Sequence, residues 1–171
     1  IEPELGAGFS IKLQSEEKFD QHRLYDTEQY FVLYYSFCDY LKLGPGYRFV
    51  RERGDNGHFA TEHRPMFDIL LSTPSWMNLK IDSRTRIEIR DKAASQAYMR
   101  YRQRFTLGID EGYTDFDLKP YIMFEMFFDD APKRNDYDIM NRTRSRIGAS
   151  FVPVLSARWL KMDFYYQIQH D

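Results

Sequence analysis

The chain has 171 residues, with 24 Lys and Arg against 26 Asp and Glu, a formal net charge of −2 and a single cysteine. This length suits one domain, residues 1–171, and the balanced charge indicates neither a nucleic-acid binder nor a polyacidic tail. One cysteine, Cys38, excludes an internal disulfide and a multi-cysteine metal site. The longest apolar run, residues 30–37, is far shorter than the roughly 18–20 residues of a membrane helix, so a helical membrane protein is excluded.

Alternation of apolar and polar residues recurs along the whole chain and predicts β-strands. The clearest case is "KIDSRTRIEIRD" at 80–91, where a charged residue stands at every second position with isoleucine, serine or threonine between. No segment shows a convincing helical period. In chain order, the nine predicted strands are residues 4–14, 28–38, 41–53, 63–72, 77–92, 98–109, 118–129, 141–152 and 157–169.

The links between these strands tend to alternate in length. Longer polar links are predicted at about 15–27, 54–62, 93–97 and 130–140, and shorter ones near 39–40, 73–76, 110–117 and 153–156. Membrane barrels have this pattern, with long outer loops and short periplasmic turns, although 93–97 and 110–117 depart from it. Acidic residues of the long links, such as Glu16, Asp26 and Asp136, are interpreted as solvated, because they lack the spacing of a calcium loop.

Each predicted strand has one apolar and one charged face, and the two-residue alternation alone does not say which face contacts water. A soluble barrel places the charges outside, whereas a membrane barrel places them inside. Considered alone, the cost of burying charges favours the soluble barrel, of which a lipocalin-like binding barrel is one form.

Three features favour the membrane barrel instead. The apolar faces run for about five or six alternate positions, which suits the roughly 9–11 residues of a tilted membrane strand. Aromatic residues, among them Tyr40, Trp76 and Tyr98, gather near strand ends as interfacial belts do. Glu125 lies between the arginine rows of the sixth and eighth predicted strands, so internal charges have partners. We therefore predict an all-β, antiparallel up-and-down transmembrane β-barrel of about ten strands with a polar, filled lumen.

This fold assigns residues to two environments. A structural charge network is expected in the lumen, formed by Arg48, Arg84, Arg86, Glu88, Arg90, Arg100, Arg102, Arg104, Glu125, Arg142, Arg144, Arg146 and Asp163. Lipid-facing positions are expected at Phe31, Leu33, Leu43, Phe49, Ile87, Ile89, Phe105, Phe124, Met126, Phe164 and Tyr166.

The strand motifs also resemble a known family. They are "GYRFVRER", "HRPMFDILL", "RTRIEIRD", "RYRQRF", "KPYIMFEMFF", "NRTRSRIGASF" and "FYYQIQ", which follow one another between residues 41 and 169. In order and spacing they resemble the bacterial outer-membrane β-barrel family catalogued as domain of unknown function 2490. The first two predicted strands match it only in character. The resemblance implies a barrel in the outer membrane of a Gram-negative bacterium and implies no activity. The chain starts without a basic segment followed by an apolar one, so we expect that any export signal has been removed or was never there.

Several functions fit such a barrel. We expect a structural or adaptor barrel that contacts lipid and other outer-membrane or periplasmic proteins, with no cofactor, no metal and no nucleic-acid partner. The arginine rows leave a narrow, anion-preferring channel as an alternative, although a lumen of eight to ten strands is just wide enough for side chains. An outer-membrane hydrolase is a further alternative, but no candidate lies in a recognisable catalytic motif, so no catalytic residue is assigned. The candidates weighed were Ser10, Ser36, Ser72, His63, His170, Asp68, Glu88, Glu125 and Asp163.

An odd number of strands leads to one more expectation. Single-chain bacterial outer-membrane barrels have an even number of antiparallel strands, and an open barrel leaves two unpaired edges in hydrocarbon. We therefore predict that the natural protein continues through a loop into a tenth strand that pairs with residues 5–13.

Overall fold

The computed structural model describes residues 4–6, 8–20, 23–54, 57–92, 96–130, 140–152 and 162–170, and these form an all-β structure. The described part of the chain contains no helix long and apolar enough to cross a membrane. Its ten strands are β1 (Glu4–Gly6), β2 (Phe9–Asp20), β3 (Arg23–Cys38), β4 (Leu41–Arg53), β5 (Phe59–Ser72), β6 (Leu79–Lys92), β7 (Tyr98–Ile109), β8 (Lys119–Asp130), β9 (Met140–Phe151) and β10 (Met162–His170).

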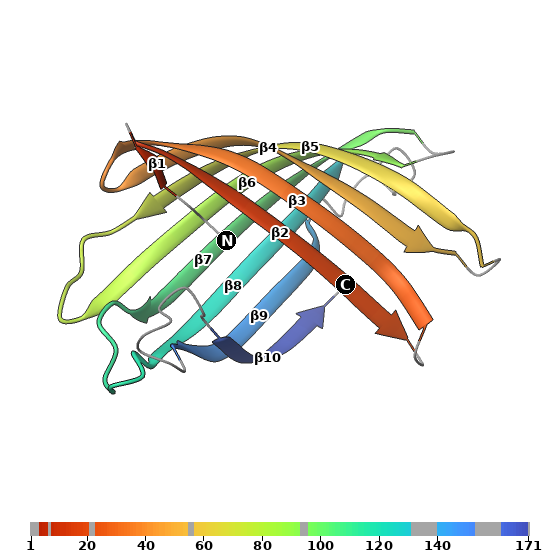
Figure 1. Cartoon of the computed structure of the whole chain (residues 1–171). Coiled ribbons are helices and arrows are strands. Elements are labelled where there is room, and N and C mark those ends of the chain that lie inside the picture. The colour runs from red at the N-terminus through yellow and green to blue at the C-terminus, as the bar shows by residue number, and fades with distance from the viewer. Residues whose placement is uncertain are drawn as a thin grey trace.

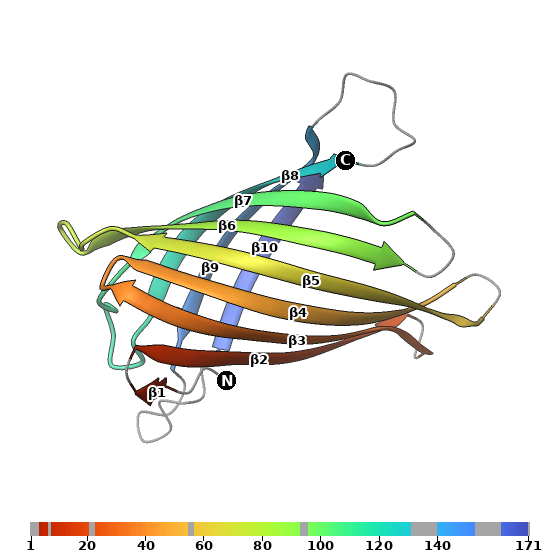
Figure 2. The same cartoon turned by 90° about the horizontal axis from the view of Figure 1, so that it is seen from above.

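The strands form one up-and-down antiparallel sheet in which each strand pairs with the next, in the order β1 to β10. Figures 1 and 2 show this sheet curled into a half-barrel. In Figure 1, β2 and β3 lie in front of β8 and β9, and the concave side of the sheet is between them. Among the described residues, no ladder joins β10 to β1 or β2, so the sheet is open along these edges. The antiparallel up-and-down prediction is confirmed. The predicted count of nine strands is wrong, because the described residues form ten, so the odd count no longer supports a further closing strand, which stays an untested prediction.

The N-terminal third differs from the sequence prediction in two ways. The single strand expected at 4–14 is two strands, because the chain turns back at Gly8, whose φ of 81° is in the region that glycine favours. The long link expected at 15–27 is mostly strand, since Glu16 pairs with Glu28 and Glu17 with Thr27. Adjacent charges had suggested a solvated loop, but backbone ladder hydrogen bonds do not require an apolar face, so β2 and β3 continue beyond the alternating segment.

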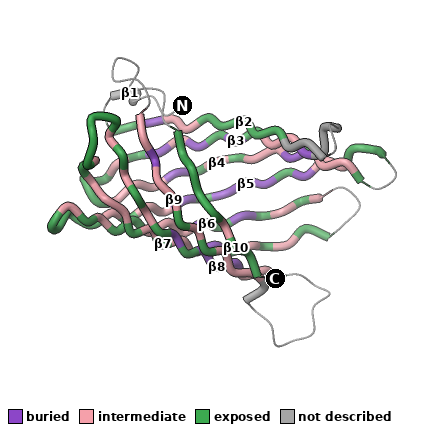
Figure 3. Tube along the Cα trace, turned by 90° about the horizontal axis from the view of Figure 1, so that it is seen from below, coloured by how far each residue is buried: buried purple, intermediate pink, exposed green. Residues whose placement is uncertain are grey.

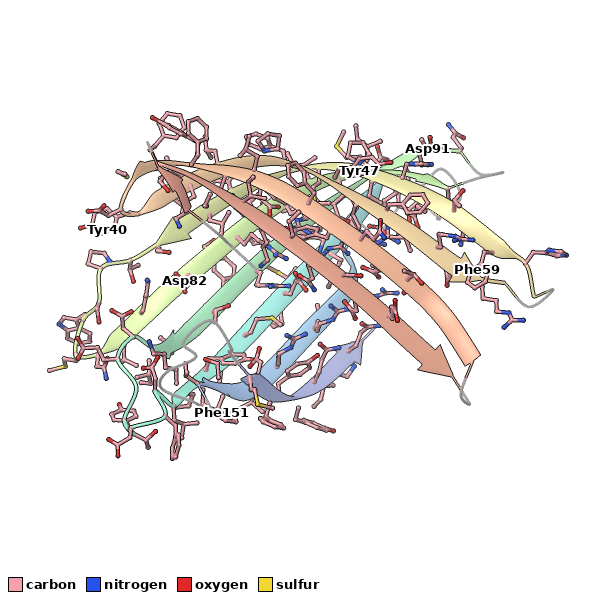
Figure 4. The ribbon with its side chains drawn as sticks, in the orientation of Figure 1. Tyr40, Tyr47, Phe59, Asp82, Asp91 and Phe151 are labelled. Carbon is pink, nitrogen blue, oxygen red and sulfur yellow. The ribbon has the colours of Figure 1, made fainter. Side chains whose placement is uncertain are left out.

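The two faces of the sheet carry the residues that alternation predicts. On β6, Arg86 and Glu88 are fully buried on the concave face, while Ile87 and Ile89 are 39% and 48% exposed on the convex face. Figure 3 shows buried and exposed positions alternating along β5, and the same alternation holds in the middle of β6. Figure 4 shows nitrogen- and oxygen-bearing side chains gathered within the curled sheet. The alternation is thus inverted relative to a water-soluble barrel.

All eleven residues expected to face lipid lie on the convex face. Seven of them are exposed, namely Phe31, Ile87, Ile89, Phe105, Phe124, Phe164 and Tyr166. The other four, Leu33, Leu43, Phe49 and Met126, are partly exposed. The medium that this face meets is not determined by its exposure, so contact with lipid stays a prediction.

One polar cluster interrupts the convex face. The Gln103 side chain accepts a hydrogen bond from Thr85 Oγ1 at 2.6 Å and from the Tyr101 hydroxyl at 3.0 Å, and donates to Ser83 Oγ at 2.8 Å. These groups satisfy one another, which is the condition under which polar groups are tolerated in hydrocarbon.

A small apolar core lies on the concave face of β3 to β5. Tyr30, Val32, Tyr34 and Met66 pack together there, and Leu70 lies against them. Two glycines of β4 leave room for this packing: a Cβ on Gly44 would lie 2.5 Å from Tyr34 Cδ1, and one on Gly46 would lie 2.6 Å from Val32 Cγ2. The large side chains of β3 therefore lie directly over the glycines of β4.

Candidate functional site

The candidate site is the network of charged side chains on the concave face. It is built from cross-strand rows, because residues that pair across an antiparallel ladder point to the same side of the sheet. One row runs through Arg84 on β6, Arg104 on β7, Glu125 on β8 and Arg144 on β9. Arginines stand directly opposite one another in this row, and such like-charge pairs destabilise a sheet unless a counter-charge is close.

Glu125 is the counter-charge of that row. Its carboxylate is fully buried, and its Oε1 lies 3.0 Å from Arg102 Nη2, 3.0 Å from Arg104 Nη2 and 3.5 Å from Arg84 Nη2. Its Oε2 lies 3.6 Å from Arg144 Nη1. One carboxylate is therefore shared by four guanidinium groups.

Glu88 forms the second buried centre. Its Oε1 accepts from Arg102 Nη1 at 3.0 Å and lies 3.5 Å from Arg86 Nη1. Arg102 thus bridges Glu88 and Glu125, and its guanidinium carbon lies 4.8 Å from the centre of the Phe127 ring. The bridge links the ion pairs of β6, β7 and β8 into one network.

Asp68 on β5 forms the third centre, which is the most complete. Arg86 binds its carboxylate with both ends of the guanidinium fork, from Nε to Oδ1 at 2.5 Å and from Nη2 to Oδ2 at 2.7 Å. The Tyr34 hydroxyl donates to Oδ2 at 2.7 Å, and the Tyr30 hydroxyl donates to Oδ2 at 3.3 Å while accepting from Arg86. Both Asp68 and Arg86 are fully buried, so each charge depends on the other.

Further ion pairs lie on the concave face beyond these three buried centres, nearer the start of β5 and the end of β6. Glu62 binds Arg64 at 2.7 Å and also Arg90, and Arg100 binds Asp129 through both ends of its fork. Arg48 donates to Glu28 at 3.1 Å. Arg90 lies over the ring of Tyr98, which is on the concave face, so the interpretation of Tyr98 as a belt residue is wrong. Tyr98 was assigned to the belt because it is close to the end of its strand. Its place in the two-residue alternation of that strand, which puts it on the same face as Arg100 and Arg102, was not considered.

The remaining predicted network residues take part through weaker contacts. Arg142 lies over the Phe127 ring, and Arg146 lies 3.8 Å over the Tyr165 ring and donates to Gln167 at 2.7 Å. Asp163 accepts from the Tyr121 hydroxyl at 3.0 Å. All thirteen predicted members thus share the concave face, and the structure brings most of them into ion pairs.

Sequence reasoning missed several partners that complete the network. They are Glu28, Tyr30, Tyr34, Glu62, Arg64, Asp68 and Asp129. Asp68 had been weighed only as a catalytic carboxylate, and residues around Glu28 and Glu62 adjoined predicted loops. Parity was the signal that could have found them, because on β3 and β5 the even-numbered positions are those buried on the concave face.

Six of the nine candidate catalytic groups are engaged in structural contacts, whereas Ser10 Oγ is buried without a hydrogen-bond partner among the described residues. Asp68, Glu88 and Glu125 are bound by arginines, and His63 contacts the Tyr47 hydroxyl on the convex face. Ser72 donates to Asp82 at 2.5 Å near the end of β5. Within the described ranges, no group of three or more His, Cys, Asp or Glu side chains is arranged to hold a metal ion.

The network surrounds a cavity of about 750 Å³ on the concave side of the sheet. Twelve Lys and Arg side chains line it against five Asp and Glu side chains. The acidic lining residues are Glu16, Asp26, Glu28, Glu52 and Asp163, of which the first four lie on β2 to β4. The basic side chains gather mainly on β6, β7 and β9, so the cavity has one acidic wall and one strongly basic wall.

Comparison with known proteins identifies a family and nothing more specific. No curated protein and no solved structure matches the chain significantly. The family match covers residues 1–171 and so includes the first two strands, for which the sequence resemblance was only general. The chain therefore belongs to the family described as protein of unknown function (DUF2490).

Proposed function

We propose that this chain is a transmembrane β-barrel of the Gram-negative outer membrane, with a structural or adaptor role and no turnover. The observation that carries the proposal is the inverted alternation of the sheet. Large apolar side chains such as Ile122, Phe124 and Ile147 are exposed on the convex face, while Arg86, Glu88 and Glu125 are fully buried on the concave face. An exposed apolar face that spans many strands is stable in hydrocarbon, whereas soluble monomers rarely expose apolar patches above a few hundred Å².

The competing soluble barrel makes an opposite prediction about detergent. A membrane barrel refolds only into micelles or bilayers and then typically migrates differently on gels before and after heating. A soluble barrel refolds as a monomer in buffer alone. Refolding of the purified chain with and without a maltoside detergent, followed by size-exclusion chromatography, separates the two. A folded, monodisperse monomer without detergent contradicts the membrane proposal.

The engaged carboxylates support a role without turnover. A catalytic acid or base must be free to exchange a proton with a substrate. Asp68 and Glu125 are instead fully buried beneath arginines that hold them in ion pairs. The hydrolase alternative therefore has less support from the network than the structural role.

The adaptor role is tested along the wall itself. A photo-crosslinking residue is placed in turn at three convex positions, Leu13 on β2, Phe105 on β7 and Ile168 on β10, which are all exposed. If the barrel holds a partner protein in the membrane, one sector gives a discrete protein adduct in living cells and the others give lipid adducts. Lipid adducts from all three sectors contradict the adaptor role and leave the barrel proposal intact.

A narrow, anion-preferring channel is the second candidate function. It is favoured by the cavity of about 750 Å³ and by its excess of basic lining residues. Planar-bilayer recording distinguishes the two functions. A barrel whose polar interior blocks the pore gives no stable single-channel steps, whereas a channel gives steps whose reversal potential in a KCl gradient shows anion preference.

A further inference from the structure

The arginines around Glu125 carry more positive charge than the carboxylates beside them neutralise. Arg84, Arg102, Arg104 and Arg144 all contact this one carboxylate. Among the described residues, only Arg102 of these four has a second acidic partner within the salt-bridge distance, Glu88, which it shares with Arg86. The cluster therefore contains several guanidinium charges for which the contacting carboxylates provide only part of the counter-charge.

These arginines are placed so that they can reach a ligand. Glu125 is fully buried beneath them, whereas the side chains of Arg84, Arg104 and Arg144 keep 15%, 27% and 22% of their surface exposed. All three line the cavity. Arg84 and Arg144 also each keep a buried Nε with no hydrogen-bond partner among the described residues. Those Nε atoms lie beneath the surface, so the exposed part of each guanidinium side chain is what a ligand in the cavity can reach.

The acidic wall of the cavity does not remove this excess at the cluster. Glu28 is paired with Arg48 at 3.1 Å, Glu52 with Lys92 at 3.3 Å, and Asp163 accepts from Tyr121. Four of the five acidic lining residues are on β2 to β4, which β5 separates from the basic strands β6, β7 and β9 in the order of the sheet. The positive charge of β6, β7 and β9 is therefore local.

We propose that the cluster formed by Arg84, Arg104 and Arg144 above Glu125 binds an oxyanion of the phosphate class. Guanidinium groups present planar pairs of N–H donors that match the oxygens of phosphate, and such charge-assisted hydrogen bonds are about twice as strong as neutral ones. The cavity of about 750 Å³ has room for a phosphate group and for more of a phosphorylated molecule. The cluster would bind the anion whether or not the cavity conducts ions. The inference therefore adds a ligand site to the structural role proposed above.

The test is titration of the whole chain, folded in an uncharged maltoside detergent, with inorganic phosphate. Ionic strength is held constant by replacing KCl with the phosphate salt. Binding is followed by calorimetry and by the thermal unfolding temperature, which rises when a ligand binds the folded state. Saturable binding of phosphate above chloride is expected. A phosphate titration indistinguishable from the chloride titration overturns the proposal.

Variants locate the site and separate it from general charge. Arg104→Gln and Arg144→Gln are each expected to weaken phosphate binding about tenfold, because each removes a charge-assisted contact. Glu125→Gln removes the competing carboxylate and is expected to tighten binding, a result that a merely structural role does not produce. Lys80→Gln changes the net charge equally, but Lys80 pairs with Asp110 outside the cavity, so it should leave binding unchanged.

Two results overturn the assignment of the site. One is equal weakening by Lys80→Gln and by the cavity variants, and the other is weaker binding in Glu125→Gln that still folds. If a glutamine variant does not fold, Arg104→Lys and Arg144→Lys keep the charge but lose the planar fork, and unchanged binding in both contradicts the proposal. A parallel titration with dihexanoyl phosphatidic acid against dihexanoyl phosphatidylcholine distinguishes a lipid headgroup from free phosphate as the source of the bound group.

Discussion

The buried pair of Asp68 and Arg86 gives the sharpest test of the network. Asp68→Asn keeps the shape of the side chain but removes its charge. Arg86 is then left fully buried, with Glu88 Oε1 3.5 Å away as its remaining carboxylate contact among the described residues. Removing one partner of a buried ion pair costs about 3–5 kcal/mol, because the remaining charge is uncompensated. We expect a loss of about 3 kcal/mol, since asparagine still accepts one hydrogen bond.

Removing both charges together should cost much less than the two single changes. The cycle compares the single variants Asp68→Leu and Arg86→Met with the double variant that carries both, in which Glu88 keeps its contact with Arg102 at 3.0 Å. The hydroxyls of Tyr30 and Tyr34 lose their carboxylate acceptor but remain 3.4 Å apart. A buried unsatisfied hydroxyl costs roughly 1–3 kcal/mol, so the double variant should lose only about that amount. The coupling free energy between the two positions is therefore expected to exceed about 2 kcal/mol.

Urea unfolding of the protein in lipid vesicles measures these free energies, with tryptophan fluorescence as the signal from the two tryptophans. Lys80 and Asp110 form the control pair, at 3.9 Å with side chains 36% and 38% exposed. Exposed pairs of this kind contribute about 0–1 kcal/mol, so that cycle should show little coupling. Single-variant losses that add up in the Asp68 and Arg86 cycle would refute the reasoning, because additivity means that the two charges do not depend on each other.

Three further predictions concern the wall, the core and the hydroxyl ligands of Asp68. Ile87→Arg on the convex face should lose about 2–4 kcal/mol of unfolding free energy in vesicles, whereas Ile87→Leu should lose little; a tolerated arginine would place this face in water. Gly46→Ala should lose about 1–3 kcal/mol by overpacking. Its control is Gly108→Ala, whose added Cβ comes no closer than 3.4 Å to Tyr121 Cβ and should be neutral in the same unfolding assay. Tyr34→Phe removes the 2.7 Å hydrogen bond to Asp68 and should cost roughly 1.5–3 kcal/mol, whereas Tyr35→Phe on the exposed convex face should change the unfolding midpoint very little.

The sequence allowed the two faces to be predicted because the period of a strand is exactly two residues in every environment. Parity alone separated Arg86 from Ile87 and Glu125 from Phe124, and the structure places each on the expected face. The same parity could have marked Asp68 as a concave residue, but the sequence analysis considered it only as a candidate catalytic carboxylate. Faces are thus a local property of the sequence.

Which residues become neighbours across strands could not be predicted in the same way, because it depends on the register between strands. Asp68 accepts from Tyr34, which lies 34 positions earlier in the chain, and this contact depends on the registers of β3 with β4 and of β4 with β5. Register is set by turn geometry and by packing, which in this case includes the fit of Tyr34 and Val32 over Gly44 and Gly46. A one-residue shift at either ladder would move Asp68 away from its hydroxyl donors. Alternation in the sequence contains no such information.

The arrangement of short acidic and long basic side chains explains how one network can be both stable and basic. Asp68, Glu88 and Glu125 are fully buried near the sheet, while Arg84, Arg104 and Arg144 reach Glu125 from β6, β7 and β9 and keep part of their surface exposed. Because an arginine is long and has five donors, several of them can share one deep carboxylate. Isolated one-to-one pairs would leave the cavity wall neutral, whereas shared carboxylates leave guanidinium groups in excess at its surface. The anion site we propose is therefore a consequence of how the concave face buries its acids, and it requires no residue beyond those that stabilise the sheet.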